Sequence, residues 1–452
     1  MTPEQSPEVT RLIELIQDTL AHNDLAGVAD ELKPQQTEKL VDALERLGAK
    51  DRAIAYRLLP KQTALEVFED FDPSIQGELV NSLRDVEVAA IFEELEPDDR
   101  VWLLDELPAS VAPKLLHGLS LEDRRLTASV LGYPKDSIGR RMSPEYVACR
   151  EGATVGQAMD RVRARMDDAE TIYTLPVLDD SRHVVGVVSL RDLLREDPDT
   201  PIADVLSPTH VAEATEDAEE AARRLAEQGL LAMPITDSED RLVGILTFDD
   251  AMRIIEHEES EDTARQGGVE PLHRPYLSTP TWAIVKSRIV WLLVLAVGAV
   301  LTVQVLSTAE ATLAQVTVLT LFVPLLIGTG GNTGNQAATT VTRALALGDV
   351  EPKDIMKVLG KEFGVGMLLG GALGIIGFAV TSLIFEVQIG LIIGLTLLAI
   401  CTWAATIGGI MPLVARAVHA DPAVFSNPFI TTFTDATGLI IYLAIARAIL
   451  GI

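Results

Sequence analysis

The chain has 452 residues, a formal net charge of −29 and a mean hydropathy of +0.25. This combination excludes one uniform soluble domain, because acidic soluble proteins are rarely apolar on average. Residues 1–280 hold 58 Asp and Glu against 29 Lys and Arg, whereas residues 281–452 hold eight of each. An acidic soluble region therefore precedes a membrane region, and its charge favours cations over nucleic acid as partners.

The two cysteines lie in different regions, Cys149 in the soluble part and Cys401 in an apolar run, so no disulfide framework is expected. The chain begins MTPEQSPEVTRLIEL, without the basic and apolar segments of a cleavable signal peptide. We therefore expect the soluble region to stay in the cytoplasm.

Four similar segments follow one another within residues 47–131. They read LGAKDRAIAYRLL, FDPSIQGELVNSL, LEPDDRVWLLDEL and LSLEDRRLTASVL, and their starts are 24 residues apart. Each has a turn signal, then apolar residues at helical spacing, and a further short helical stretch before the next copy. The pattern predicts an all-α superhelical repeat domain over residues 1–135. In the simplest interpretation its carboxylates, such as Glu66, Asp98 and Asp99, are solvated surface charges.

A second internal repeat occupies residues 142–258. The copies read MSPEYVACREGATVGQAMDRV…LPVLDDSRHVVGVVSLRDLL and LSPTHVAEATEDAEEAARRL…MPITDSEDRLVGILTFDDAM. Each predicts a strand, a helix, a strand, a charged turn, a VGVV or VGIL strand and a helix. The pattern resembles tandem cystathionine-β-synthase-type (CBS) domains, an α/β pair that we place at residues 136–200 and 201–248.

Both copies end in the motif S/T-x-x-D, as Ser189-Leu-Arg-Asp192 and Thr247-Phe-Asp-Asp250. In CBS domains this hydroxyl and carboxylate often contact an adenosine ribose. The resemblance therefore implies ATP or another adenine nucleotide as a candidate ligand of Ser189, Arg191 and Asp192. The motif has a second interpretation, because Asp at a helix start also caps the helix.

An acidic segment, FDDAMRIIEHEESEDTARQGG, comes next and predicts a long helix within a connector over residues 249–280. Seven carboxylates lie within fourteen residues: Asp249, Asp250, Glu256, Glu258, Glu259, Glu261 and Asp262. Like charges one turn apart destabilise a helix unless cations bridge them. The segment is either a solvated linker or a coupling element, and its position before the first membrane span favours coupling.

The last part of the chain predicts a transmembrane domain of five helices over residues 281–452. The apolar stretches lie near 284–306, 316–347, 358–385, 389–417 and 426–450. Each has about 20 residues or more, as a ~30 Å hydrocarbon core requires. Basic residues precede the first span and follow the second and fourth. The positive-inside rule therefore predicts a multi-pass protein of the cell inner (plasma) membrane, with the N-terminus cytoplasmic and the C-terminus outside.

The second apolar stretch would be roughly 48 Å long as one helix, and GTGGNTGNQ at residues 328–336 interrupts it. Amides at membrane depth need protein or water around them, so the segment is predicted to line an aqueous path, with Asn332 among its polar groups. The alternative is close helix packing, for which Gly330 and Gly334 have the small-xxx-small spacing. The third span carries glycines without polar neighbours, which predict packing: Gly366, Gly370 and Gly374.

Asp435 in the last span lies about 12 Å along a helix from Asn427, well inside the hydrocarbon. A carboxylate costs at least ~2.5 kcal/mol there, so it needs a partner, a cavity or a proton. The threonines around it suit a hydrated passage: Thr431, Thr432, Thr434 and Thr437. No span contains His, and oxygen ligands suit a hard cation such as Mg²⁺. A protonated Asp435 bonded to a neighbouring helix is the alternative.

The order of helical repeats, CBS pair, acidic helix and five spans resembles the MgtE family of bacterial magnesium transporters and channels. The most specific pieces are PLLIGTGGNTGNQ at 324–336 and DPAVFSNPFITTFTDATG at 421–438. The resemblance implies a homodimer in membrane lipid, without enzymatic activity, that encloses one Mg²⁺-selective pore. Its implied pore residues are Asp435, Asn332 and Asn427, and two facing Asp435 side chains would repel unless a cation lay between them.

The resemblance also implies a gate that the transported ion controls. At high cytosolic Mg²⁺, ions would bridge the helical repeats, the CBS pair and the connecting "plug" helix and close the pore, and carboxylate repulsion would reopen it. The implied bridging residues are Glu66, Asp98, Glu219, Asp250, Glu258, Glu261, Asp262 and, at the inner mouth, Asp421. Three residues depart from the pattern, because Trp102, Gly229 and Arg253 stand where acidic residues are expected.

Two other functions stay open. A CBS-regulated secondary carrier of a small solute would use Mg²⁺ only structurally, but carriers commonly show repeated halves with matching broken helices, which these spans lack. A magnesium sensor without transport would leave Asp435 and GTGGNTGNQ unexplained.

Overall fold

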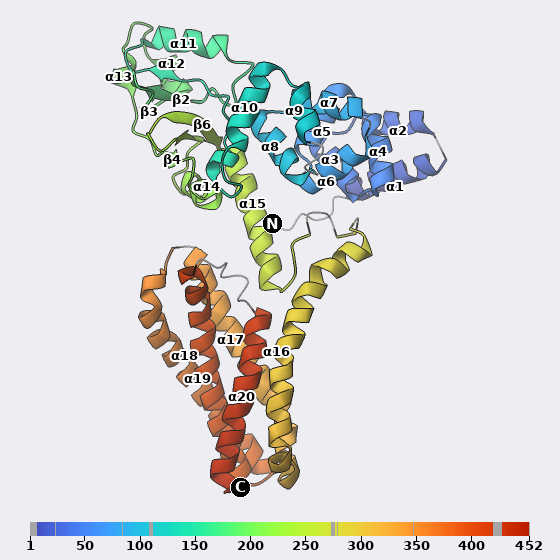
Figure 1. The fold of residues 1–452 in the computed structure, drawn as a ribbon, viewed down its shortest axis with the longest axis vertical. Helices are drawn as coiled ribbons and strands as arrows, with labels where there is room; N and C mark the ends of the chain where they lie inside the picture. Colours follow the sequence, from blue (N-terminus) through green and yellow to red (C-terminus); the bar gives the residue numbers. More distant parts are fainter. Residues whose placement is uncertain are drawn as a thin grey trace. The chain divides into compact units, whose positions relative to one another are not determined.

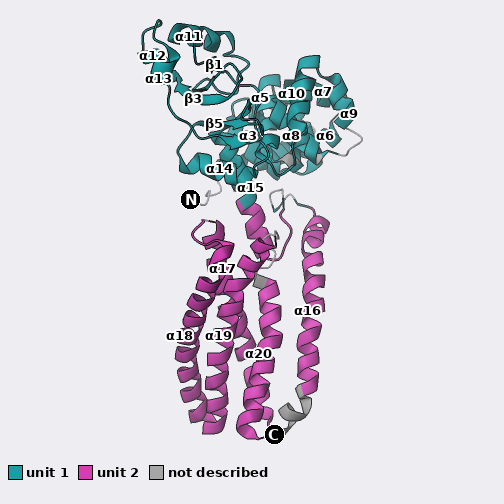
Figure 2. Ribbon diagram, turned by 60° about the vertical axis from the view of Figure 1, so that its left-hand side comes forward, with its two compact units in different colours: residues 1–258, 272–279 teal, residues 259–271, 280–452 magenta. Residues whose placement is uncertain are grey.

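The computed structural model describes residues 7–22, 24–83, 85–107, 112–272, 276–277, 279–346, 348–418 and 427–451. The chain forms two compact units, one of residues 1–258 with 272–279 and one of residues 259–271 with 280–452 (Figure 2). The division follows the predicted change from an acidic soluble region to an apolar region. Each unit is described by itself below.

The first unit begins with short helices that pack side by side (Figure 1). They are α1 (Pro7–Ala21), α2 (Leu25–Leu32), α3 (Thr37–Arg46), α4 (Ala49–Arg57), α5 (Lys61–Glu69), α6 (Pro73–Ser82), α7 (Asp85–Glu94), α8 (Pro97–Glu106), α9 (Ala112–Gly118) and α10 (Leu121–Leu131). Their apolar faces share one core, which includes Leu44, Phe68 and Phe92. The predicted helix pairs of the 24-residue repeat are confirmed.

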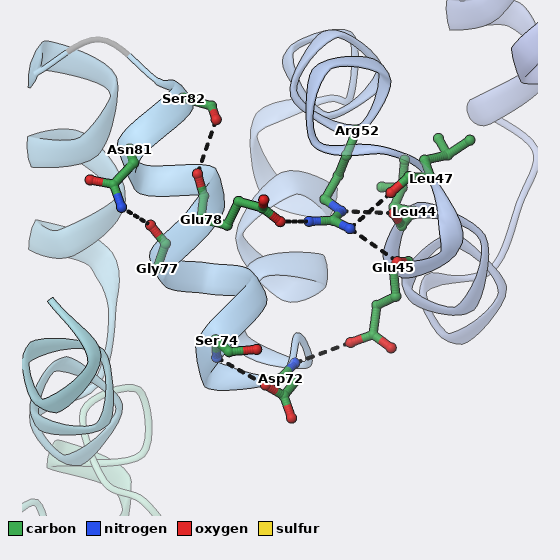
Figure 3. Close-up of polar contacts among 10 residues, drawn as sticks. All are labelled: Leu44, Glu45, Leu47, Arg52, Asp72, Ser74, Gly77, Glu78, Asn81 and Ser82. Atoms are coloured by element: carbon green, nitrogen blue, oxygen red, sulfur yellow. Dashed lines mark hydrogen bonds and ion pairs between the residues drawn. The ribbon is translucent and has the colours of Figure 1, made fainter. Parts of the chain in front are cut away.

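Arg52 is a buried side chain that links neighbouring copies of the repeat. Its guanidinium donates to the carbonyl oxygens of Leu44 at 2.9 Å, Glu45 at 3.0 Å and Leu47 at 2.9 Å, where α3 ends (Figure 3). It also pairs with Glu78 of α6 at 2.8 Å. The last carbonyls of a helix have no partner within that helix. One buried side chain therefore ends one helix and joins it to a helix of the next copy.

The same position does the same work in the other copies. Arg100 and Arg124 each donate from Nε to the carbonyl eight residues earlier, at 3.0 Å and 2.8 Å. In the second copy the amide of Gln76 donates to the carbonyl of Phe68 at 2.7 Å. All four copies therefore share one hydrogen bond, from a side chain to the carbonyl eight residues earlier, at the turn between the helices of a pair.

Two three-stranded sheets follow, with the same strand order and register. Their strands are β1 (Cys149–Arg150), β2 (Thr174–Leu178), β3 (Val184–Ser189), β4 (Ala212–Glu213), β5 (Ala232–Thr236) and β6 (Leu242–Thr247). In each sheet the first two strands are parallel and the last two antiparallel. The helical elements of this part are η1 (Ile138–Arg140), α11 (Val155–Ala164), α12 (Leu190–Arg195), α13 (Ile202–Val205) and α14 (Ala218–Glu227). The predicted internal repeat is confirmed.

Each copy of this repeat begins on the sheet of the other copy. Ser143 exchanges two 2.9 Å backbone hydrogen bonds with Ile245 of β6, and Ser207 does the same with Val187 of β3. The strand glycine makes room, since a Cβ on Gly186 would lie 2.6 Å from the Ser207 carbonyl oxygen. The glycine of each VGVV or VGIL strand therefore permits the reciprocal pairing that joins the two copies.

The acidic segment is helical: α15 (Phe248–Gln266) starts directly after β6. The helices of the second unit are α16 (Thr281–Gln315), η2 (Thr317–Phe322), α17 (Val323–Ala346), η3 (Pro352–Asp354), α18 (Ile355–Ile384), α19 (Val387–Ala417) and α20 (Asn427–Leu450). In the described part of the chain, four of these are long and apolar enough to cross a membrane, namely α16, α18, α19 and α20. The polar residues of α17 keep it outside this group.

The expectation that GTGGNTGNQ breaks the second span is wrong. α17 is one α-helix through residues 328–336, and the irregular turn is the 3₁₀ segment η2 before it. Its glycines allow close packing, because a Cβ on Gly408 of α19 would lie 2.2 Å from the Gly334 carbonyl oxygen. The packing prediction for α18 is confirmed, as its glycine series lies against the backbone of α19: Gly366, Gly370 and Gly374.

Candidate functional site

Asp435 lies on α20, which packs against α16, α17 and α19. Its side chain is half-buried, and its Oδ1 is inaccessible to solvent without a hydrogen-bond partner among the described residues. Buried carboxylate oxygens are rarely left unpaired, because desolvation is not compensated. This atom is therefore the strongest candidate in the second unit for contact with a cation.

The helix that carries the polar motif lies directly against α20. Asn335 Nδ2 donates to Thr431 Oγ1 at 3.0 Å, one turn before Asp435. A Cβ on Gly331 would lie 3.1 Å from Thr431 Cγ2, and one on Gly334 would lie 2.8 Å from Ile430 Cγ2. Glycines and one amide of the motif thus bring α17 close to the helix of Asp435.

A second face of α17 carries most of its exposed polar residues. Gly328, Asn332, Gln336, Thr339 and Arg343 are spaced by three or four residues, so they share one side of the helix, and all five are exposed in this chain. The two interpretations of the motif therefore apply to different faces. Glycines and Asn335 serve packing, whereas Asn332 and Gln336 remain open for water or another polar surface.

The threonines around Asp435 donate hydrogen bonds within their own helix. Thr432, Thr434 and Thr437 each donate to the carbonyl four residues earlier in α20, at 3.0, 2.9 and 2.9 Å. Thr437 also accepts from Trp403 Nε1 at 3.0 Å. The hydroxyl oxygens can still act as acceptors or as cation ligands through their lone pairs. Asn427, predicted to line the pore, begins α20, and Asp421 lies outside the described residues.

A second candidate site lies in the first unit. Glu96, Asp98 and Glu170 each place a carboxylate oxygen within 4.8 Å of the others. Asp98 is 3% exposed, and its Oδ1 and Glu170 Oε2 are buried without hydrogen-bond partners among the described side chains. The interpretation of Asp98 and Asp99 as solvated surface charges is wrong, because Asp98 is buried and Asp99 is largely shielded at a contact with the CBS repeat. The family resemblance implied Asp98 as a ligand, but Glu96 and Glu170 were missed. Glu170 lies 72 residues from Asp98 in sequence, and no local pattern links the two.

The carboxylates of Glu96, Asp98 and Glu170, which we call the acidic cluster, repel one another when they are ionised. Burial raises the pKa of Asp98 well above its usual range, and Asp99, Asp250, Glu170 and Glu96 raise it further. Burial, then the neighbouring Glu96, raises the pKa of Glu170 to about 9. Burial also raises the pKa of Asp250. Carboxylate oxygens are hard ligands, and a bound divalent cation would offset the repulsion between them.

Two further predicted ligands have partners of their own. Glu66 is exposed on α5 and accepts from Thr37 Oγ1 at 3.0 Å. It helps to raise the pKa of Glu69 to about 7, after burial and the charge of Asp99. Glu219 pairs with Arg223 one turn along α14 at 2.8 Å. The described interactions of Glu66 therefore reach Thr37 and Glu69, and the described contacts of Glu219 stay within its helix.

The predicted plug residues lie on α15. Glu258 and Asp262 are half-buried, and Glu261 pairs with Arg265 at 2.7 Å. Beyond the helix end, Gly268 has φ +66°, and a Cβ there would lie 2.8 Å from Pro428 Cγ. Only glycine adopts this conformation without strain. Within the second unit, the chain just after α15 therefore contacts the first turn of α20, the helix of Asp435.

The motif residues of the CBS repeat cap their helices. Ser189 Oγ accepts from the Asp192 backbone N–H at 3.1 Å and donates to Asp192 Oδ2 at 2.6 Å. Thr247 Oγ1 donates to Asp250 Oδ2 at 2.6 Å in the same way. Arg191 is exposed beside the first pair. The motif therefore does cap its helix in the first copy, but through Ser189 and not through the Asp that was expected. A ribose would have to compete for the same hydroxyl and carboxylate.

Gly229 is one of the three residues that stand where acidic residues were expected, and its backbone conformation explains why a glycine occurs there. Its φ is +63°, directly after α14 (Ala218–Glu227) and its cap Gln228. A left-handed residue at a helix end is usually glycine, because other side chains are strained there. Trp102 and Arg253 instead make contacts between the helical repeats and the CBS repeat, which are analysed below.

These units define a multi-pass membrane protein with helical-repeat and CBS domains outside its spans. Residues 323–445 match the divalent cation transporter family MgtE, residues 35–136 match the MgtE intracellular N domain, and residues 136–199 and 202–257 match the CBS domain. The chain belongs to the MgtE transporter family.

Relatives and a solved structure agree with this assignment. A protein of Thermus thermophilus named magnesium transporter MgtE is 36% identical over 97% of this chain and 99% of its own length. A Bacillus subtilis protein of the same name is 27% identical, covering 97% of each chain. The crystal structure of the cytosolic domain of the Mg²⁺ channel MgtE in complex with ATP is 32% identical, covers 54% of this chain and 99% of that chain, and has a TM-score of 0.50.

Proposed function

We propose that this chain is a Mg²⁺-selective channel or transporter for magnesium uptake. The observation that carries the proposal is the buried Oδ1 of Asp435 in the last membrane span, which has no hydrogen-bond partner in the described part of the chain. A carboxylate is expensive there unless a cation or water meets it. Relatives over nearly the whole chain are named magnesium transporters.

The exposed polar face of α17 supports a path between two copies of the chain. Asn332 and Gln336 would face lipid in a monomer, where amides are unfavourable. In a homodimer embedded in membrane lipid, the two faces and the two Asp435 side chains would border one hydrated passage. A divalent cation gains roughly 4.6 kcal/mol per 100 mV from an inside-negative potential, so uptake needs no other energy source.

We propose that cytosolic Mg²⁺ closes this path. Asp98 Oδ1 and Glu170 Oε2 have no hydrogen-bond partner among the described residues, which favours a bound cation at the acidic cluster, where Asp250 also contributes charge. Glu66 would bind a further ion on α5. The contact of Gly268 with Pro428 gives α15 a route to α20. Glu258, Glu261, Asp262 and Glu219 would bind further ions, and Asp421 would meet the plug helix at the inner mouth.

The remaining assignments follow from this function. The first 280 residues would be cytoplasmic and the C-terminus outside, as the charges between the spans require. The domain divisions are those predicted from the sequence: repeats to residue 135, CBS domains to 200 and 248, and a connector to 280. ATP would bind at the CBS pair near Ser189, Arg191 and Asp192, and no catalytic role is assigned.

Single-channel recording in planar bilayers tests the proposal. With purified protein and a Mg²⁺ gradient, we expect discrete currents that fall in open probability when millimolar Mg²⁺ is added to the cytosolic side. Saturating flux without unitary currents would identify a carrier instead. Protein that binds Mg²⁺ but passes no ion would be a sensor, and either result would contradict the channel.

A further inference from the structure

One side of α8 is held by residues that lie outside the helical repeats. Asp99, Trp102 and Asp105 follow one another at intervals of three residues, so they share that side. They contact three guanidinium groups, which belong respectively to Arg253, Arg141 and Arg140. These three arginines lie within the segments that match CBS domains. The contacts therefore form a joint between two parts of the first unit, which we call the α8 joint.

Arg253 contacts carboxylates on both sides of this joint. Its Nη1 lies 3.2 Å from Asp99 Oδ1 on α8 and 3.9 Å from Asp250 Oδ1 on its own helix. Both carboxylates are largely shielded, with side chains 13% and 14% exposed. The second oxygen of Asp250 accepts from Thr247. The guanidinium thus stands between one carboxylate of the helical repeats and one of the second CBS copy.

Trp102 adds an apolar contact at the same joint. The guanidinium carbon of Arg141 lies 3.2 Å from the centre of its ring, and His257 meets the ring edge-on at 6.0 Å. The ring also packs against the core of the second CBS copy, which includes Ile254. A cation over an aromatic face is attracted by the ring, and more strongly when both are desolvated.

A bidentate ion pair between Arg140 and Asp105 completes the joint. Arg140 Nη2 donates to Asp105 Oδ1 at 2.7 Å and its Nε donates to Oδ2 at 3.3 Å. Both side chains are largely buried. Such bidentate pairs fix geometry as well as charge, and removal of one partner leaves the other unpaired.

Without Arg253, Asp99 and Asp250 would lose the guanidinium that contacts them both. Both carboxylates lie beside Arg253 and raise the pKa of the neighbouring Asp98, and the charge of Glu96 raises the pKa of Asp99 and of Asp250. Arg253 opposes this, since its charge lowers the pKa of Asp99 and of Asp250. A protein with an uncharged residue at 253 would need a metal cation here, whereas this chain supplies its own.

We propose that α8 stays docked on the second CBS copy without a divalent cation, because the guanidinium of Arg253 takes the place of a metal cation between Asp99 and Asp250. The contacts of Trp102 and Asp105 complete the α8 joint. This goes beyond the proposed function, since docking is defined without reference to ion flux. Removal of divalent cations then leaves the α8 joint closed. Cation-dependent movement is confined to other contacts, such as the acidic cluster with Glu170 and the residues of α15 beyond Arg253.

Hydrogen exchange with mass spectrometry on the full chain in detergent tests the inference. In the wild type, we expect the amides of α8 to exchange equally slowly in EDTA and in millimolar Mg²⁺. Arg253→Gln should exchange about tenfold faster in EDTA, which corresponds to a loss of ~1.4 kcal/mol, and Mg²⁺ should restore the protection. Arg253→Lys should stay close to the wild type, since it keeps the charge.

Two variants serve as controls. Arg241→Gln removes an exposed pair with Glu239 on the same CBS copy and should change nothing at α8. Asp99→Asn removes the Arg253 pair from the other side and should also speed exchange at α8. Unchanged protection of β5 and β6 in each variant shows that the CBS fold is intact.

The inference is overturned if wild-type α8 exchanges in EDTA as fast as Arg253→Gln, or if that variant and Asp99→Asn both exchange as slowly as the wild type. If Mg²⁺ fails to restore protection in Arg253→Gln, then Arg253 is an ordinary ion pair and not a substitute for a metal cation. None of these readouts involves transport. Failure of the α8 joint and failure of the proposed Mg²⁺ flux are therefore separate results.

Discussion

Asn335 Nδ2 donates a 3.0 Å hydrogen bond to Thr431 Oγ1, and this bond joins α17 to α20 one turn before Asp435. The two residues lie 96 positions apart in the chain. Asn332 belongs to the same polar motif but is exposed on the other side of α17. The two amides therefore have different expected roles, one in helix packing and one at the ion path.

Asn335→Ala should lower the thermal stability of the protein in detergent, because an interhelical hydrogen bond contributes about 0.6–2 kcal/mol in membrane proteins. Asn332→Ala should leave the melting temperature unchanged and reduce Mg²⁺ flux. Both properties can be measured on the same preparations. An equal loss of stability in the two variants would show that the faces of α17 are assigned incorrectly.

Neutralisation of the acidic helix should weaken inhibition by internal Mg²⁺. In a variant with Glu258→Gln, Glu261→Gln and Asp262→Asn together, we expect higher flux than in the wild type at millimolar internal Mg²⁺ and equal flux at low Mg²⁺. Removal of the carboxylates removes the proposed ion sites. Glu227→Gln with Glu239→Gln provides a control of similar charge change on the CBS surface, where flux should not respond. Unaltered inhibition in the triple variant would make α15 a plain linker.

The acidic cluster predicts a pH dependence of stability. Burial raises the folded-state pKa of Glu170 to about 9 and that of Asp99 to about 7, well above the unfolded-state values of about 4. The folded state therefore binds more protons, and its stability should fall as pH rises from about 5 to 9. Mg²⁺ should reduce this loss, because it replaces the protons.

Thermal unfolding in EDTA across this pH range measures the effect. Glu170→Gln should flatten the profile in EDTA and remove part of the stabilisation by Mg²⁺. Glu151→Gln, an exposed carboxylate of the same CBS copy, serves as the control and should retain the wild-type profile. Stability that rises with pH over this window would contradict the burial of these carboxylates.

Arg52→Ala should destabilise the first unit by about 3–5 kcal/mol, the range seen when one member of a buried pair is removed. The variant leaves Glu78 and the carbonyls at the end of α3 without their donor. Arg46→Ala breaks an exposed pair with Asp42 and should cost less than about 1 kcal/mol. Urea unfolding of the two variants distinguishes them, and equal midpoints would rule out the structural role of the repeated arginine.

Patterns that repeat along the chain predicted the fold well. The 24-residue period, the two CBS copies and the apolar stretches each depend on local spacing, and the helices and strands occur where that spacing indicated. The error at GTGGNTGNQ has a tertiary cause. Glycine and amide residues suggest a break when read alone, but contacts such as Gly334 with Gly408 hold them in one continuous helix.

Local sequence also indicated some residues of the candidate sites and not others. Asp435 was predictable because a carboxylate in an apolar span is conspicuous in the sequence. Glu96 and Glu170 were not, since only the folding of the helical repeats and a CBS copy brings them to Asp98. Arg253 was noticed as a departure, but its pairing with Asp99, 154 residues away, required the structure.

The central claim is that Asp435 meets the permeating ion. Mg²⁺ uptake into proteoliposomes tests it most directly, with Asp435→Ala and Asp435→Asn compared with the wild type and with Glu386→Gln, which neutralises an exposed carboxylate of the same unit. We predict that both Asp435 variants lose most of the Mg²⁺ flux while remaining folded, and that Glu386→Gln keeps it. Mg²⁺ flux equal to the wild type in both Asp435 variants would contradict the account.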